Sequence, residues 1–93
     1  MERLEIGDVV ISLKGRDKNQ SFLVCDIDGD FAYIVNGKQR KVLSAKKKNV
    51  KHLEKVKGVS LIELALQIKK GTPVGNDRLA RAVKSATKII RED

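Results

Sequence analysis

The chain has 93 residues, a formal net charge of +8 at pH 7 and one cysteine. This length suits a single domain, the lone cysteine excludes an internal disulfide, and no apolar run approaches the length needed to cross a bilayer. The first six residues are short and charged, so we expect no secretory leader and a cytoplasmic protein. The excess of positive charge favours a polyanionic partner.

Two strands and a polar loop are the first predicted elements. Apolar and polar side chains alternate over residues 7–13, which is typical of a half-buried strand. Residues 14–19 form a tight polar loop, and a second apolar strand follows over residues 21–27. This strand contains Cys25, which we expect to act as a small buried hydrophobic residue.

Two turn signals predict hairpins after the second strand. Asp-Gly at residues 28–29 leads into a strand over residues 31–35, and Asn-Gly at residues 36–37 leads into a strand over residues 39–43. Residues 50–53 would add a short fifth strand that closes the sheet, because small sheets bury their edges by curling. The pattern is a meander and not a βαβ unit.

Helical periodicity begins at Ser60. Ser60 and Glu63 predict a capping box, and apolar residues then recur at helical spacing until Gly71. A short turn precedes a second helix, which starts near residues 76–77 and carries an apolar stripe opposite a basic face. The stripe consists of Leu79, Val83, Ala86 and Ile90. The apolar stripes must be covered by each other, by the sheet or by a partner.

Positive charge is concentrated in one segment. Residues 38–57 hold nine Lys or Arg residues against Glu54 alone, whereas residues 1–37 hold four against seven acids. Such a segment attracts polyanions and releases their condensed counterions. It contains no basic amphipathic helix that would favour a membrane surface. The candidate contacts in it are Lys38, Arg40, Lys41, Lys46, Lys47, Lys48 and Lys51.

The first polar loop is a second candidate site. Arg16 offers a planar fork for phosphate, Lys14 and Lys18 offer point charges, and Gly15 permits close backbone approach. We predict that Asp17 fixes the loop through a backbone hydrogen bond. From these residues alone, the loop is either a plain hairpin connection or an anion-binding loop.

Catalytic and metal chemistry have little support. A Ser-His-Asp set cannot be assembled around the single His52, which also lacks partner ligands, and neither HExxH nor GxxxxGK[ST] occurs. We therefore expect no enzymatic activity, no metal and no cofactor. The three aromatic residues, Phe22, Phe31 and Tyr33, lie in strand patterns where burial in the core is the default. Their scarcity favours structured RNA, read by shape and phosphate, over stacked single strands.

Residues 7–24 resemble the KOW motif. The matching residues are Gly7, Asp8, Val9, Val10, Ile11, Gly15, Arg16, Asp17, Lys18, Phe22, Leu23 and Val24. The likeness is to KOW-domain proteins of the large ribosomal subunit and to short bacterial KOW-domain RNA-binding proteins. A basic stretch that ends in Lys51, His52 and Leu53 extends it over roughly the first 55 residues. Asn19 stands where the family usually has glycine, and Asn also enters the left-handed region readily.

Pattern and resemblance together predict a mainly β fold with C-terminal helices. A small SH3-like barrel of about five strands would occupy residues 1–57, and a helical hairpin appendage would occupy residues 58–93. The resemblance implies that the loop contacts RNA through Lys14, Gly15, Arg16, Lys18 and Asn19. The predicted function is non-catalytic binding of structured RNA at the ribosome, with ribosomal RNA and ribosomal proteins as partners. The alternative is a protein-interaction module that docks transcription or ribosome machinery through the barrel or the helices.

Overall fold

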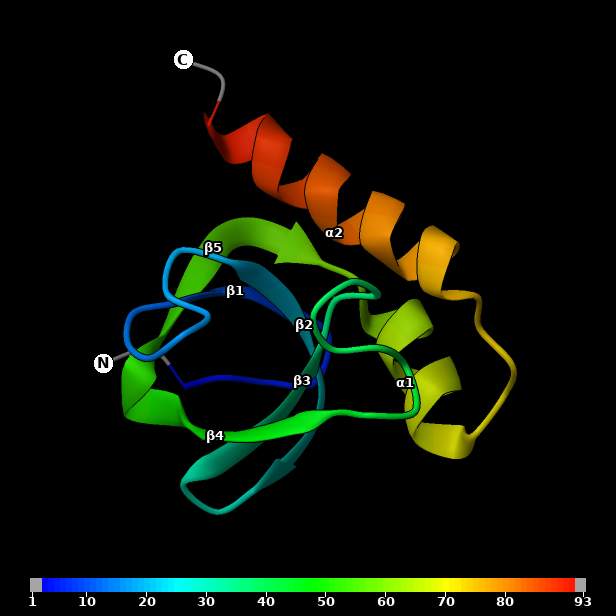
Figure 1. Ribbon diagram of the computed structural model, residues 1–93, viewed down its shortest axis with the longest axis horizontal. Helices are drawn as coiled ribbons and strands as arrows, with labels where there is room; N and C mark the ends of the chain where they lie inside the picture. Colours follow the sequence, from blue (N-terminus) through cyan, green and yellow to red (C-terminus); the bar gives the residue numbers. More distant parts are fainter. Residues whose placement is uncertain (1–2, 92–93) are drawn as a thin grey trace.

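The computed structural model describes residues 3–91, and the side chains of residues 3–88. It is a mainly β domain in which a five-stranded antiparallel sheet is followed by two helices (Figure 1). The predicted fold class is therefore confirmed. The strands are β1 (Asp8–Ser12), β2 (Ser21–Asp28), β3 (Phe31–Val35), β4 (Lys46–Asn49) and β5 (Leu53–Ser60). A short 3-10 helix, η1 (Val50–His52), links β4 to β5, and the helices are α1 (Ile62–Lys70) and α2 (Asn76–Arg91).

The sheet is a meander with one added edge strand. Its strand order is β4-β3-β2-β1-β5, and all neighbours pair antiparallel. Register shifts in the β1–β5 and β2–β3 ladders mark bulges, which bend the strands and increase their twist. Within the described residues the two edge strands, β4 and β5, share no ladder, so the sheet is open there. Closure into a barrel stays a prediction.

The loop between β3 and β4 differs from the predicted hairpin. The strand predicted over residues 39–43 is wrong, because Asn36 Oδ1 accepts hydrogen bonds from the backbone N–H groups of Lys38 and Arg40, at 3.1 and 3.0 Å. The backbone N–H of Val42 donates to a side-chain amide oxygen at the start of α2, at 2.8 Å. Side chains thus replace the ladder partners of this segment, and the fourth strand begins only at β4.

The segment after β4 also differs from its prediction. Residues 50–53 form mainly a 3-10 turn, because Asn49 Oδ1 accepts a hydrogen bond from the backbone N–H of Lys51 at 3.0 Å. The fifth strand is therefore later and longer than predicted. Its last residue, Ser60, pairs with Asp8 across the sheet and caps no helix, so the predicted capping box does not form.

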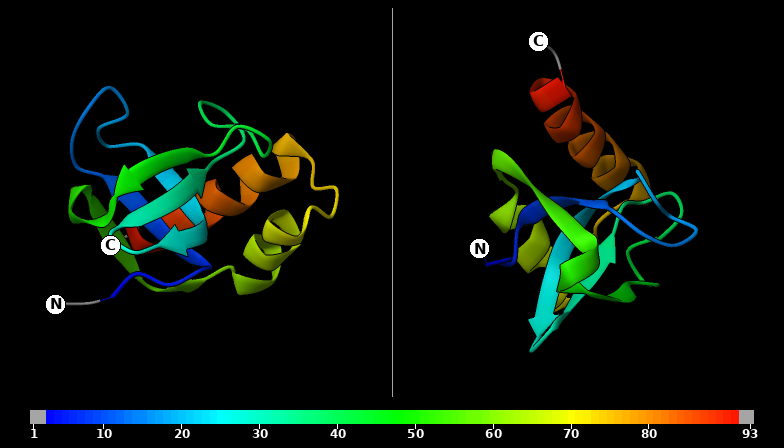
Figure 2. Two further views of the ribbon diagram at one scale, coloured as in Figure 1. Left: turned by 90° about the horizontal axis from the view of Figure 1, so that it is seen from below. Right: turned by 90° about the vertical axis from the view of Figure 1, so that its left-hand side faces the viewer.

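Both helices pack on one face of the sheet (Figures 1 and 2). α1 ends at Gly71 and α2 begins at Asn76, as predicted. The shared buried cluster contains Leu64 and Ala65 of α1, Leu79, Val83 and Ala86 of α2, and the sheet residues Val9, Leu23, Cys25, Val35 and Val56. The sheet therefore covers the described part of the α2 stripe, while the side chain of Ile90 lies outside the described residues. Each fully buried aliphatic side chain contributes roughly 1.5–3 kcal/mol.

The other face of the sheet carries a second cluster. Its buried members are Val10, Phe22, Val24, Ala32, Ile34 and Leu53. The prediction of core burial is confirmed for Phe22 but wrong for Phe31, which is 37% exposed at the start of β3. Cys25 is buried as predicted, and burial followed by the charge of Asp26 raises the pKa of its thiol to about 11. This thiol is therefore neutral at physiological pH.

Candidate nucleic-acid interface

Two polar loops lie at the same end of the sheet. They are residues 13–20, between β1 and β2, and residues 36–45, between β3 and β4, and both rise at the top of the left panel of Figure 2. The antiparallel meander brings them to one end of the sheet. The side-chain amide of Asn36 donates a hydrogen bond to the carbonyl oxygen of Ser21 at 3.2 Å, which ties the bases of the two loops together.

A buried ion pair joins the first loop to β4. Lys48 Nζ lies 2.5 Å from Asp17 Oδ1, and the two side chains are 8% and 9% exposed. The same ammonium donates hydrogen bonds to Ser12 Oγ at 2.7 Å and to the carbonyl oxygen of Lys14 at 2.5 Å. These three partners match the three donors of an ammonium. Lys48 therefore has no donor left for a phosphate, and its predicted contact with RNA has no support from the structure.

Asp17 organises the loop through its side chain. Its second oxygen, Oδ2, lies 3.0 Å from Lys46 Nζ, and Ser12 Oγ donates to Oδ1 at 2.7 Å. The predicted backbone hydrogen bond of this carboxylate is thus replaced by three side-chain partners. Burial opposes ionisation of Asp17, but the hydrogen bonds from Lys48, Ser12 and Lys46 outweigh it and hold the pKa of the carboxyl well below its usual range. The sequence pattern placed Ser12 at the end of a strand but gave no signal that its hydroxyl would contact Asp17 and Lys48.

We expect the Asp17 carboxylate to make the stability of the fold depend on pH. Its folded pKa lies below the unfolded value of about 3.9, so its contribution is complete above about pH 5, begins to decrease near pH 4 and continues to decrease until the pH has passed the folded pKa. The free energy of unfolding of Asp17→Asn should therefore approach that of the original chain as the pH is lowered from 7 to 3. Urea denaturation at each pH measures this, and a constant difference would contradict it.

Three lysines surround the single histidine. His52 is partly buried at the end of η1, and its carbonyl oxygen accepts a hydrogen bond from the backbone N–H of Leu13 at 2.9 Å. Burial, followed by the positive charges of Lys14, Lys51 and Lys48, lowers the pKa of His52. These charges come from the first loop, η1 and β4. The structure thus brings the two predicted basic stretches together around this imidazole.

We group the cations of the first loop with Lys46, which contacts the loop, and Lys51, which lies with Lys14 near His52, and call this set the basic loop face. Its members are Lys14, Arg16 and Lys18 of the first loop, Lys46 of β4 and Lys51 of η1. Lys46 is partly buried, because it also contacts the carboxylate of Asp17, whereas the other four are exposed. Gly15 is exposed in the same loop, and Asn19 adopts the left-handed conformation with φ 72°, as its residue type allows. The loop therefore keeps its turn despite the missing glycine.

The remaining predicted contacts lie apart from the basic loop face. Lys47 points to the outer side of β4, where Nζ lies 4.6 Å from the centre of the Phe31 ring. Lys38 and Lys41 are exposed and Arg40 is partly buried on the loop of residues 36–45. That loop is hydrogen-bonded to the start of α2, so these three cations form a second basic group at the same end of the sheet.

No protein family's sequence profile matches the chain, and no curated protein sequence matches it significantly. In the described part of the chain, no group of three or more His, Cys, Asp or Glu side chains could hold a metal ion. Neither of the two described helices is long and apolar enough to cross a membrane.

Proposed function

We propose that the chain is a cytoplasmic, ribosome-associated protein that binds structured RNA through its phosphates and catalyses no reaction. The buried pair of Lys48 and Asp17 carries this proposal, because it fixes the first loop against β4 and so presents the basic loop face as one surface. Cations on a fixed support lose less conformational entropy when they bind than cations on a free loop. The resemblance of residues 7–24 to the KOW motif supports RNA as the polyanion.

The expected binding mode is electrostatic clamping. Lys14, Lys18 and Lys51 supply point charges, and Arg16 supplies a fork that can hold a phosphate by two hydrogen bonds. Such contacts orient the protein on its ligand without reading base sequence. Phe22 is buried, Tyr33 is partly covered and the exposed ring of Phe31 lies under Lys47, which leaves little aromatic surface for a stacked single strand. A folded RNA, whose phosphates converge in space, suits this surface better.

We expect the double variant Lys14→Gln, Lys51→Gln to bind an RNA hairpin more weakly than the original chain. It should also reduce the slope of log K against log salt by about 1–2, because each lost phosphate contact releases about one counterion fewer. Fluorescence anisotropy at several salt concentrations measures both. The matched control is Lys70→Gln, Lys84→Gln, which removes the same charge from exposed positions on the helices. Equal effects of the two variants would count against the basic loop face, and failure of the original chain to bind would refute the proposal.

His52 gives this experiment a local readout. A phosphate seated between Lys14 and Lys51 would offset the charges that lower the pKa of His52, so the pKa should rise in the complex. NMR titration of the single imidazole, with and without the hairpin, follows this value directly. An unchanged pKa would place the RNA elsewhere on the protein.

A second candidate function is docking of a protein partner on α1. Ile62 and Leu66 lie one turn apart on this helix and are 42% and 36% exposed. The α2 stripe does not serve the same purpose, because Leu79 and Val83 are buried against the sheet. Co-sedimentation with ribosomes separates the two functions: loss after complete ribonuclease digestion supports RNA binding, whereas persistence with a protein partner supports docking.

A further inference from the structure

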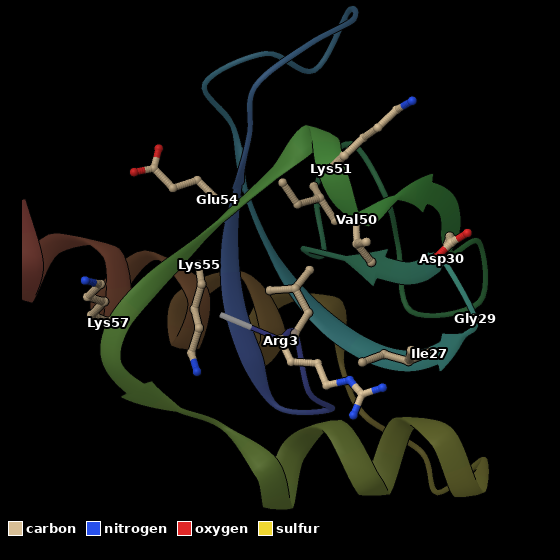
Figure 3. A pocket seen from close by; sticks show the side chains of 11 residues that line it. Arg3, Ile27, Gly29, Asp30, Val50, Lys51, Glu54, Lys55 and Lys57 are labelled. Atoms are coloured by element: carbon tan, nitrogen blue, oxygen red, sulfur yellow. The ribbon is translucent and has the colours of Figure 1, made fainter. Parts of the chain in front are cut away.

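A hollow of about 960 Å³ opens beside η1, and no residue of α1 or α2 lines it. Its walls come from the N-terminal segment, the β2–β3 turn, η1 and β5 (Figure 3). The apolar part of the lining consists of Leu4, Ile27, Val50 and Leu53, which extend the buried cluster around Phe22 and Ile34. The hollow therefore leads from solvent to the edge of the second core, and its floor is apolar.

Basic side chains surround this apolar floor. Figure 3 shows the guanidinium group of Arg3 beside Ile27 and Lys51 rising from the rim, whereas the Lys55 ammonium lies on the other side of Arg3, 3.6 Å from Asp8 Oδ1. Val50 points toward the hollow, and the acidic lining residues, Asp30 and Glu54, lie on opposite sides of it. The chemistry suits a ligand that combines a flat, weakly polar body with a negative charge.

A nucleotide has both properties, and the hollow is continuous with the basic loop face through Lys51. This lysine lines the hollow and also lies among the charges that act on His52. A phosphate held at Lys51 would therefore place the attached base at the mouth of the hollow. The planar guanidinium of Arg3 can stack on such a base, and Ile27 and Val50 can cover its apolar surface.

We propose that the hollow receives one unpaired nucleotide of the bound RNA. The inference rests on the proposed function, and it adds which part of the RNA is recognised. A paired base would have to be unstacked and unpaired before it could enter, whereas a bulged nucleotide enters at little cost. The protein should therefore prefer a helix interrupted by a bulge to a continuous one.

Two RNA hairpins of equal length and charge, closed by the same compact, stacked tetraloop, test this preference: one has a fully paired stem and the other a stem with a single bulged nucleotide. The original chain should bind the bulged hairpin about tenfold more tightly, the effect of one stacked base. Val50→Gln, which makes the floor polar, should lose this preference and keep its affinity for the paired hairpin. Lys18→Gln, on the loop and outside the hollow, should weaken both complexes equally.

The possible results distinguish a failure of the nucleotide-binding hollow from a failure of the proposed RNA binding. Equal affinity of the original chain for the two hairpins overturns the inference and leaves RNA binding standing. Absence of binding to either hairpin refutes the proposed function itself. Arg3→Gln provides a second variant at an exposed residue, so the test does not depend on the folding of Val50→Gln. A bulge preference that survives in folded Arg3→Gln and Val50→Gln proteins would place the nucleotide outside the hollow.

Discussion

Replacing Lys48 with methionine should destabilise the fold by about 3 kcal/mol. Methionine fills a similar volume, but it leaves the carboxylate of Asp17 and the hydroxyl of Ser12 without their buried ammonium partner. An uncompensated buried charge is costly, and the Lys46 ammonium and the Ser12 hydroxyl would offset it only in part. Urea denaturation at pH 7 gives the free energy of unfolding that tests this expectation.

Lys46→Met is the matched control for this substitution. Lys46 lies on the same strand and contacts the same carboxylate, but its side chain is 30% exposed against 8% for Lys48. Because the pair is closer to solvent, its loss should cost less than about 1 kcal/mol. Equal losses in the two variants would contradict the assignment of Lys48 as the buried anchor.

The Lys48→Met protein should also lose RNA affinity, even though Lys48 has no free donor for a phosphate. Release of Lys48 from the carbonyl oxygen of Lys14 would free the first loop, so the cations on it would have to be ordered during binding. The salt dependence should stay nearly unchanged, because no phosphate contact is removed. A loss of affinity together with a shallower slope would instead make Lys48 a direct contact.

Gly37→Ala should cost at least about 2 kcal/mol of stability. Gly37 has φ +80°, a conformation that costs other residues roughly 1–2 kcal/mol. A Cβ atom there would also overlap the carbonyl oxygen of Asn76 and lie 3.0 Å from the backbone nitrogen of Ala80. Both atoms belong to the first turns of α2, so the added methyl would push the loop of residues 36–45 away from the helix. Thermal or chemical denaturation measures the loss.

Gly71→Ala is the control that separates the conformational cost of a positive φ from the steric overlap with α2. Gly71 has nearly the same backbone angle, φ +81°, but no heavy atom of the described chain lies within 4 Å of a Cβ atom built there. Its substitution should therefore show the conformational cost alone. If Gly37→Ala is no more destabilising than Gly71→Ala, the close packing of the loop on α2 contributes little.

Local signals predicted the elements that depend on local physics. The alternation in β1, the Asp-Gly turn between β2 and β3, and the glycine that ends α1 all gave the observed structure, because each acts over a few residues. The Asn-Gly signal at residues 36–37 predicted a tight hairpin that does not form, because contacts between residues distant in sequence determine this loop. The partners of Asn36 and Val42 include Ser21 and Asn76, which are distant in sequence, and tertiary contacts therefore decided the course of that loop.

The lysine run of residues 46–48 shows the same limit at the candidate site. Composition treats the three side chains as equal, but strand geometry sends them to different surroundings. Lys46 reaches the edge of the Asp17 carboxylate, Lys47 covers Phe31 on the outer side, and Lys48 is buried. The sequence therefore located the basic segment but could not assign a role to each of its members.

Because the Lys48 side chain is buried, a count of basic residues does not give the number of cations that can contact a phosphate. Long-range attraction of a polyanion depends on net charge, to which a buried ammonium contributes as much as an exposed one. The number of phosphates that can be seated depends only on cations that reach solvent. With Lys48 buried against Asp17, all charged side chains act in the attraction of a polyanion from a distance, but only the exposed cations can contact its phosphates in the final complex.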